Sequence, residues 1–156
     1  MKTFFVNVRY LIVPLMSALT IVGILLGDVY AWTGVILFGL NTVADTFTRN
    51  IHHRAEFAPD GTSYGSKRFQ YAVMYFMLPT FVLLQVILAW RIFQYTSSTP
   101  FEFYSLLGIG YQSGISGLNL TGATLSAGLW AGLGIIYGHE LSHNRKEGFF
   151  ISRLIM

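Results

Sequence analysis

The residues of this chain whose types and spacing best suit chemistry lie in the sequence GHELSHNRK, at positions 138–146. His139 and His143 are four residues apart, so on a helix their side chains leave the same face about one turn apart. Two imidazoles in that arrangement can ligate one metal ion, and Glu140 adds a carboxylate between them. We favour metal binding over the alternative of two solvated histidines at the end of a helix.

The elements that must position these histidines are apolar. Hydrophobic residues make up 53% of the 156 positions and charged residues 11%, whereas an average soluble domain carries about 25% charge. The apolar residues occur in long runs, and about 20 such residues form a helix that crosses the ~30 Å hydrocarbon core of a bilayer. The composition therefore predicts an all-α fold, a polytopic transmembrane helical bundle in an integral membrane protein.

Four membrane spans are predicted from the apolar runs. The first three cover about residues 10–26, 30–45 and 69–93, with a polar loop at 46–68, and the fourth ends at the histidine motif. Residues 101–143 are too long for one helix across a bilayer, since 43 residues at 1.5 Å each would extend about 64 Å. We therefore expect a break near residues 108–117.

The placement of basic residues favours one span after that break. Basic residues tend to stay on the cytoplasmic side of a membrane. Four spans put the N-terminus, the long loop and the histidine motif on that side, as expected in a bacterial inner (cytoplasmic) membrane. In this topology only Arg91 lies on the far side, and the cytosolic residues are Lys2, Arg9, Arg49, Arg54, Lys67, Arg68, Arg145, Lys146 and Arg153.

The absence of cysteine limits the chemistry of a metal site. Without thiolates, any ion must be bound by nitrogen or oxygen. One option is a membrane zinc peptidase, in which the two histidines of H-E-x-x-H ligate zinc and Glu140 is the general base. That site needs a third ligand further on, and Glu147 follows His143 too closely to supply it. The other option is a histidine-rich, non-haem iron centre.

Residues 138–146 resemble the first histidine box of the integral-membrane alkane and xylene monooxygenases, a branch of the fatty acid desaturase and hydroxylase superfamily. In that family the box reads much like HELxHK or HELxHR and follows about four spans. The resemblance extends upstream to Asp45 at the end of a short-looped pair of spans and to the pair Pro59-Asp60. It also includes the run FQYAVMYFMLPTFVLLQVILAW, with its internal proline and terminal tryptophan.

The resemblance implies ligands, a cofactor, an activity and a partner. His139 and His143 would be ligands of a non-haem di-iron centre, and Glu140 would orient a ligating histidine. The enzyme would insert one oxygen atom from O₂ into a C–H bond of an alkane, alkyl-aromatic or fatty-acyl-like substrate. Its electrons would come from an external rubredoxin- or ferredoxin-like donor, and nothing indicates a nucleic acid partner. A desaturase of the same superfamily and a non-enzymatic packing module are the further alternatives.

The chain departs from the family pattern in two ways. Asn144 stands where the family usually has Lys or Arg, and no later histidine cluster follows the motif within the 156 residues. Two histidines cannot hold two irons. We therefore expect residues 1–156 to be the N-terminal transmembrane portion of a longer enzyme, incomplete at its C-terminal end and inactive alone.

Other polar and small residues are given structural roles. His52 and His53 are expected in a basic interfacial loop and not at the metal, and Asp45 is expected to reach lipid headgroups or Arg49. Small residues crowd the fourth span, which favours close helix packing over a channel for an apolar chain. They are Gly114, Ser116, Gly117, Gly122, Ala123, Ser126, Ala127, Gly128, Ala131, Gly132 and Gly134.

Overall fold

The computed structural model describes residues 2–56, 65–96, 105–106, 109–110 and 116–143. These parts are all-α, apart from a two-residue antiparallel pairing between β1 (Ser105–Leu106) and β2 (Ile109–Gly110). The helical elements are α1 (Lys2–Tyr10), α2 (Ile12–Leu26), the 3₁₀ turn η1 (Asp28–Trp32), α3 (Thr33–Glu56), α4 (Lys67–Thr96) and α5 (Gly117–His143).

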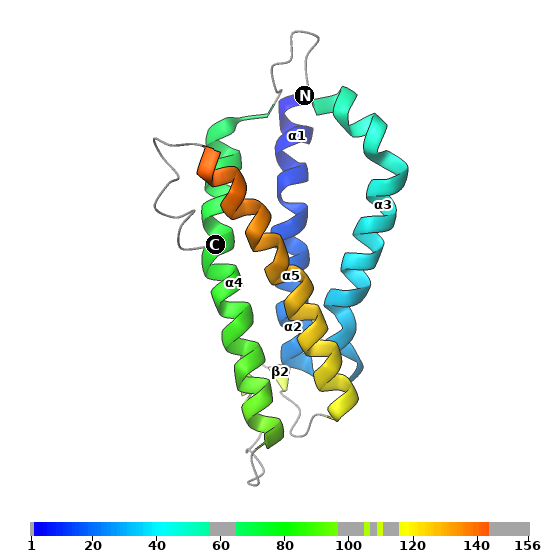
Figure 1. Ribbon diagram of the computed structural model, residues 1–156, viewed down its shortest axis with the longest axis vertical. Coiled ribbons are helices and arrows are strands. Elements are labelled where there is room, and N and C mark those ends of the chain that lie inside the picture. The colour runs from blue at the N-terminus through cyan, green and yellow to red at the C-terminus, as the bar shows by residue number, and fades with distance from the viewer. Residues whose placement is uncertain (1, 57–64, 97–104, 107–108, 111–115, 144–156) are drawn as a thin grey trace.

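The helices form four rods that run in alternating directions, the first made of α1 and α2 end to end (Figure 1). The N-terminus, the end of α3, the start of α4 and the end of α5 lie at one end of the bundle. We call this the histidine end, and the opposite end, where η1 joins α2 to α3, the η1 end. The N-terminus and the end of α5 therefore lie at the same end of the bundle, and their cytosolic side stays a prediction.

Three helical stretches are long and apolar enough to cross a membrane: Val6–Leu26, Lys67–Thr96 and Gly117–Tyr137. They match the first, third and fourth predicted spans. The predicted break before the fourth span is also confirmed, because α5 begins at Gly117. The described residues thus form a helical protein with three candidate membrane spans, which indicates an integral membrane protein.

The second predicted span differs from the structure in its bounds and its polarity. The helix α3 begins at Thr33 and continues to Glu56, so residues 46–56 are helical and not part of a loop. No proline or glycine interrupts residues 40–56, and the Thr46 hydroxyl donates to the Thr42 carbonyl within the helix at 2.9 Å. With 24 residues α3 is long enough to cross a bilayer, but its polar second half keeps it from qualifying as a candidate span.

The first rod is interrupted at Leu11, and Pro14 explains where. Proline has no N–H to donate to the Tyr10 carbonyl, so the regular helical bonding pattern cannot pass this point. The Leu11 N–H instead donates to the Val8 carbonyl at 3.0 Å, and the pattern resumes when Leu15 N–H donates to Leu11 at 3.0 Å. The helix thus begins well before the predicted residue 10.

A cluster of buried apolar side chains lies toward the η1 end. It joins the end of α2, the second half of α4 and the first half of α5, with Ile24, Leu84 and Trp130 fully buried. Small residues permit this approach: a Cβ added to Gly122 would lie 2.6 Å from the Trp32 ring. The predicted close packing is confirmed for a stretch of α5 in which Gly122, Ala123, Ser126 and Ala127 are buried.

Candidate functional site

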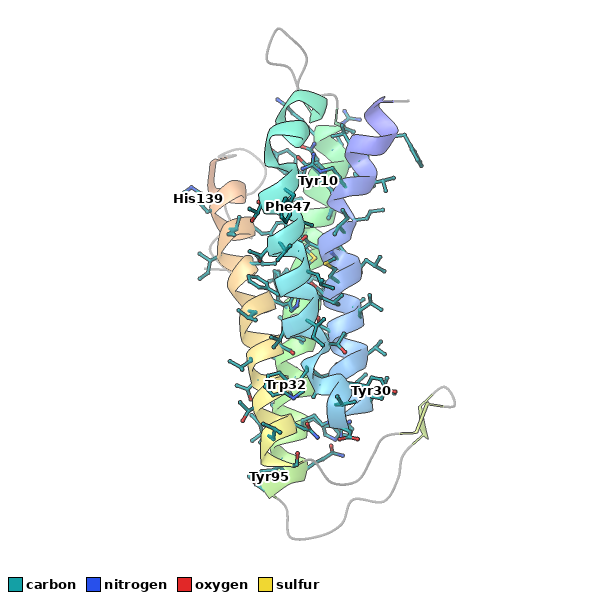
Figure 2. The ribbon with its side chains drawn as sticks, turned by 90° about the vertical axis from the view of Figure 1, so that its right-hand side faces the viewer. Tyr10, Tyr30, Trp32, Phe47, Tyr95 and His139 are labelled. Atoms are coloured by element: carbon teal, nitrogen blue, oxygen red, sulfur yellow. The ribbon has the colours of Figure 1, made fainter. Side chains whose placement is uncertain are left out.

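The histidine motif lies at the end of α5, beyond the apolar stretch that can span a membrane. Residues 138–143 are helical, so His139 and His143 share one face of α5 about one turn apart, as predicted. His139 is exposed, and Figure 2 shows it on the outer side of α5, pointing away from the other helices. The side chains of Glu140 and His143, and residues 144–146 of the motif, lie outside the described part of the chain.

His139 and His143 could supply two of the ligands of a metal ion, but not a complete site. Within the residues that the structure describes, no group of three or more His, Asp or Glu side chains could hold a metal ion. Two imidazoles one turn apart fit two positions of a metal's coordination sphere. Because His139 points away from the bundle, any further ligands would have to approach α5 from outside the four described rods.

His52 and His53 lie on the last turns of α3, a helix where a loop was predicted. The loop prediction failed here because α3 continues without interruption to Glu56. The side chains of both histidines are outside the described set. In Figure 1 the last turns of α3 and of α5 lie apart at the histidine end. Asp45 is exposed on α3, and the predicted pairing with Arg49 lies outside the described side chains.

A cavity of about 390 Å³ lies at the histidine end, and the sequence did not reveal it. It lies between the first rod, α4 and α5, and Tyr137 on its wall is two residues before His139. The available signals were weak: an Arg-Tyr pair that ends four residues before a helix-interrupting proline, and a tyrosine beside the motif. The lining residues are Arg9, Tyr10, Val13, Met74, Leu133, Ile136 and Tyr137.

Arg91 has a structural role that charge counting did not reveal. In the predicted topology, Arg91 is the single basic residue on the non-cytosolic side of the membrane. In the structure its side chain is 1% exposed and lies at the η1 end. Its Nε donates to the Ile24 carbonyl at 2.8 Å, and its Nη2 donates to the Leu25 carbonyl. These are two of the carbonyls that the end of α2 leaves without helical partners. A buried arginine therefore caps α2 and is not a candidate for catalysis.

The described basic residues lie at both ends of the bundle. Lys2, Arg9 and Lys67 lie on helical segments at the histidine end, and Arg91 lies near the other end of α4. The last three basic residues of the predicted cytosolic set, Arg145, Lys146 and Arg153, are outside the described residues.

No protein-family model, curated protein or solved structure matched the chain in the comparisons made. The family resemblance of residues 138–146 therefore rests on the motif and its position after the apolar helices.

Proposed function

We propose that the chain is part of a membrane-bound, non-haem di-iron oxidoreductase similar to the alkane monooxygenases. Its reaction would be the O₂-dependent hydroxylation of a C–H bond in an alkane, alkyl-aromatic or fatty-acyl-like substrate. An external rubredoxin- or ferredoxin-like protein would supply electrons. The bilayer would be the bacterial cytoplasmic membrane, with the histidine end in the cytosol.

One observation carries this proposal: His139 and His143 share a helix face where a membrane-length helix ends. Neutral imidazoles on one helical turn suit iron as well as zinc, and the absence of cysteine favours nitrogen and oxygen ligands. A cavity with a largely apolar wall lies at the same end of the bundle as the motif, although His139 is not on its wall.

The proposed roles of this chain follow from its own residues. His139 and His143 would bind iron through their ring nitrogens, and Glu140 would hold one imidazole in its ligating orientation. The rest of the iron ligands would come from residues outside the described set. When bound, the iron centre supplies the activation of O₂. The apolar helices would exclude water and hold the substrate's hydrocarbon part near the histidine end.

Metal analysis of the complete gene product, purified from membranes, tests the proposal. We expect about two irons per polypeptide and little zinc. His139→Ala and His143→Ala should each lower bound iron several-fold, because metal sites depend strongly on each ligand. His53→Ala, at the same end of the bundle, is the matched control and should leave the iron content unchanged.

The possible results separate the alternatives. One zinc per chain would indicate the peptidase, provided that Glu140→Gln abolishes peptidase activity while the zinc content stays the same. Iron with a dehydrogenated product in place of an alcohol would indicate a desaturase. A purified, folded gene product that retains no metal would contradict both enzyme classes and leave the packing module.

A further inference from the structure

We propose that the cavity at the histidine end binds an anionic, single-chain amphiphile, with its carboxylate or phosphate on Arg9 and its chain among the helices. This site does not depend on iron, so it can exist whether or not the proposed oxidoreductase activity is correct. The proposal rests on the composition of the cavity wall, its depth in the bundle and its size.

The wall of the cavity combines apolar side chains with three polar ends. Val13, Met74, Leu133 and Ile136 come from three separate rods and form an apolar surface of the kind that holds a hydrocarbon chain. The polar lining residues are Arg9, Tyr10 and Tyr137. A ligand that matches this wall has a long apolar part and one polar group.

The position of Arg9 suits an anionic head group. Arg9 lies in the last turn of α1, less than one turn inside the apolar stretch that begins at Val6. This is the depth at which a membrane helix meets the lipid head groups. A guanidinium is always charged and presents paired N–H donors that match a carboxylate or phosphate. Tyr10 and Tyr137 carry hydroxyl groups that can also donate to such an anion.

The size and opening of the cavity favour one chain. A volume of about 390 Å³ is near the lower end of the roughly 300–1,000 Å³ typical of ligand sites. Ile136 on its wall is 57% exposed, so at this residue the wall of the cavity reaches the surface of α5, within a few residues of the end of the apolar stretch at Tyr137. In the proposed site, an amphiphile would enter past this residue and leave the rest of its chain in lipid.

The test uses the full chain, delipidated in a neutral detergent, and radiolabelled palmitate as the probe. Competition by hexadecanol and by hexadecyl phosphate compares three head groups on the same chain length. We expect hexadecanol to compete at least roughly tenfold more weakly than palmitate, since a charged hydrogen bond is lost. A preference for palmitate or for hexadecyl phosphate distinguishes a fatty acid from a phosphate-bearing lipid, and either result supports the anion site.

Two pairs of variants place the ligand in this cavity. Arg9→Gln should weaken palmitate binding roughly tenfold or more, and Arg68→Gln, exposed at the same end and outside the cavity wall, should not. Ile136→Trp should block the cavity, whereas its neighbour Ile135→Trp, which is 64% exposed and not on the wall, should bind normally. Thermal unfolding of each variant checks that the bundle is intact.

Two results would overturn the proposal. Equal competition by hexadecanol and palmitate would show that the cavity binds apolar chains without a preference for an anionic head group. Unchanged palmitate binding in both Arg9→Gln and Ile136→Trp would place the ligand elsewhere. The head-group comparison uses the unmodified chain, so it decides the question even if a variant fails to fold.

Discussion

The two ends of the bundle differ in how their helices are held together. At the η1 end, side chains of α4 and α5 bind several free backbone groups of the α2–α3 connection. At the histidine end, the Ser66 N–H before α4 donates to the Asn7 side-chain oxygen of α1 at 2.9 Å, and the helices enclose a cavity. In a bilayer, where unpaired backbone groups are costly, the described bonds of this kind are more numerous at the η1 end than at the histidine end, where His139 is exposed.

The η1 end contains a tight connection that would otherwise leave polar backbone groups unpaired. Arg91 from α4 caps the last carbonyls of α2. From α5, the Ser126 hydroxyl donates to the Ala31 carbonyl at 2.8 Å and accepts from the Val35 N–H at 3.2 Å. The Trp130 indole donates to the Gly34 carbonyl at 3.0 Å. Two different helices therefore satisfy the two sides of the α2–α3 connection.

The close approach at this end depends on residues without bulky side chains. A Cβ added to Gly34 would lie 2.6 Å from Ser126 Cβ and 2.7 Å from Thr20 Cγ2. By contrast, Gly39 in the first half of α3, and Gly128 and Gly132 further along α5, have no such neighbour within 4 Å. Substitutions at the close contacts of the η1 end should therefore cost more than substitutions at positions with open space, and the following predictions test this.

Removal of the Arg91 side chain should have the largest effect. Arg91→Ala leaves the Ile24 and Leu25 carbonyls unpaired in an apolar setting and opens a cavity. We expect a loss of about 3–5 kcal/mol in unfolding free energy, measured by denaturant titration in micelles. Arg91→Lys should recover part of the loss, because it keeps the charge but not the planar donor group. The exposed Arg68→Ala should change stability by less than about 0.5 kcal/mol, and a similar loss there would contradict a specific cap.

Enlargement of Gly34 should have the next largest effect. Gly34→Val forces α3 away from Thr20 and Ser126, and such overpacking costs about 1–3 kcal/mol. The control is Gly39→Val on the same helix, where the added atoms meet open space. Thermal unfolding of both variants should show a lowered Tm only for Gly34→Val. Equal shifts would mean that valine acts through helix propensity and not through packing.

Loss of the Ser126 hydroxyl should be milder. Ser126→Ala removes one hydrogen bond to η1 and one to the start of α3 but no packing volume of consequence, so we expect about 1–2 kcal/mol of destabilisation. Thr124→Val is the matched control, since the Thr124 hydroxyl is exposed and donates only within its own helix, to Leu120, at 2.9 Å. Hydrogen exchange at the Val35 amide gives a direct measurement, and exchange should accelerate in Ser126→Ala alone.

Sequence patterns predicted the helices and their relative directions but not the contacts between them. Long apolar runs locate three spans, and alternation across a bilayer then places His139 at the same end as the N-terminus. The predicted end of the second helix, at about residue 45, was wrong because the polar residues after it were interpreted as a loop. No helix-breaking residue follows Asp45 before Pro59. The caps by Arg91 and Ser126 join residues more than 60 positions apart, and no local pattern carries that information.

The candidate site was predictable to a similar degree. The spacing of His139 and His143 already implied one helix face, because it depends only on local geometry. The cavity depends on side chains from three rods, so only the fold reveals it. The direction in which the His139 side chain points also depends on how the helices assemble. It lies on the outer side of α5 and is not part of the cavity wall.

The smallest expected effect is that of His139→Ala on the metal-free protein. A buried histidine with a structural role would leave a hole and unpaired groups when removed. His139 is exposed on the outer side of α5, so its loss should change the unfolding free energy by less than about 0.5 kcal/mol in chelator. If this residue binds metal, the same variant should lose the stabilisation that added metal gives the native protein, because a ligand that binds only the folded state raises its stability. A large loss in chelator would instead assign His139 to the fold, and the contrast between the two ends would no longer hold.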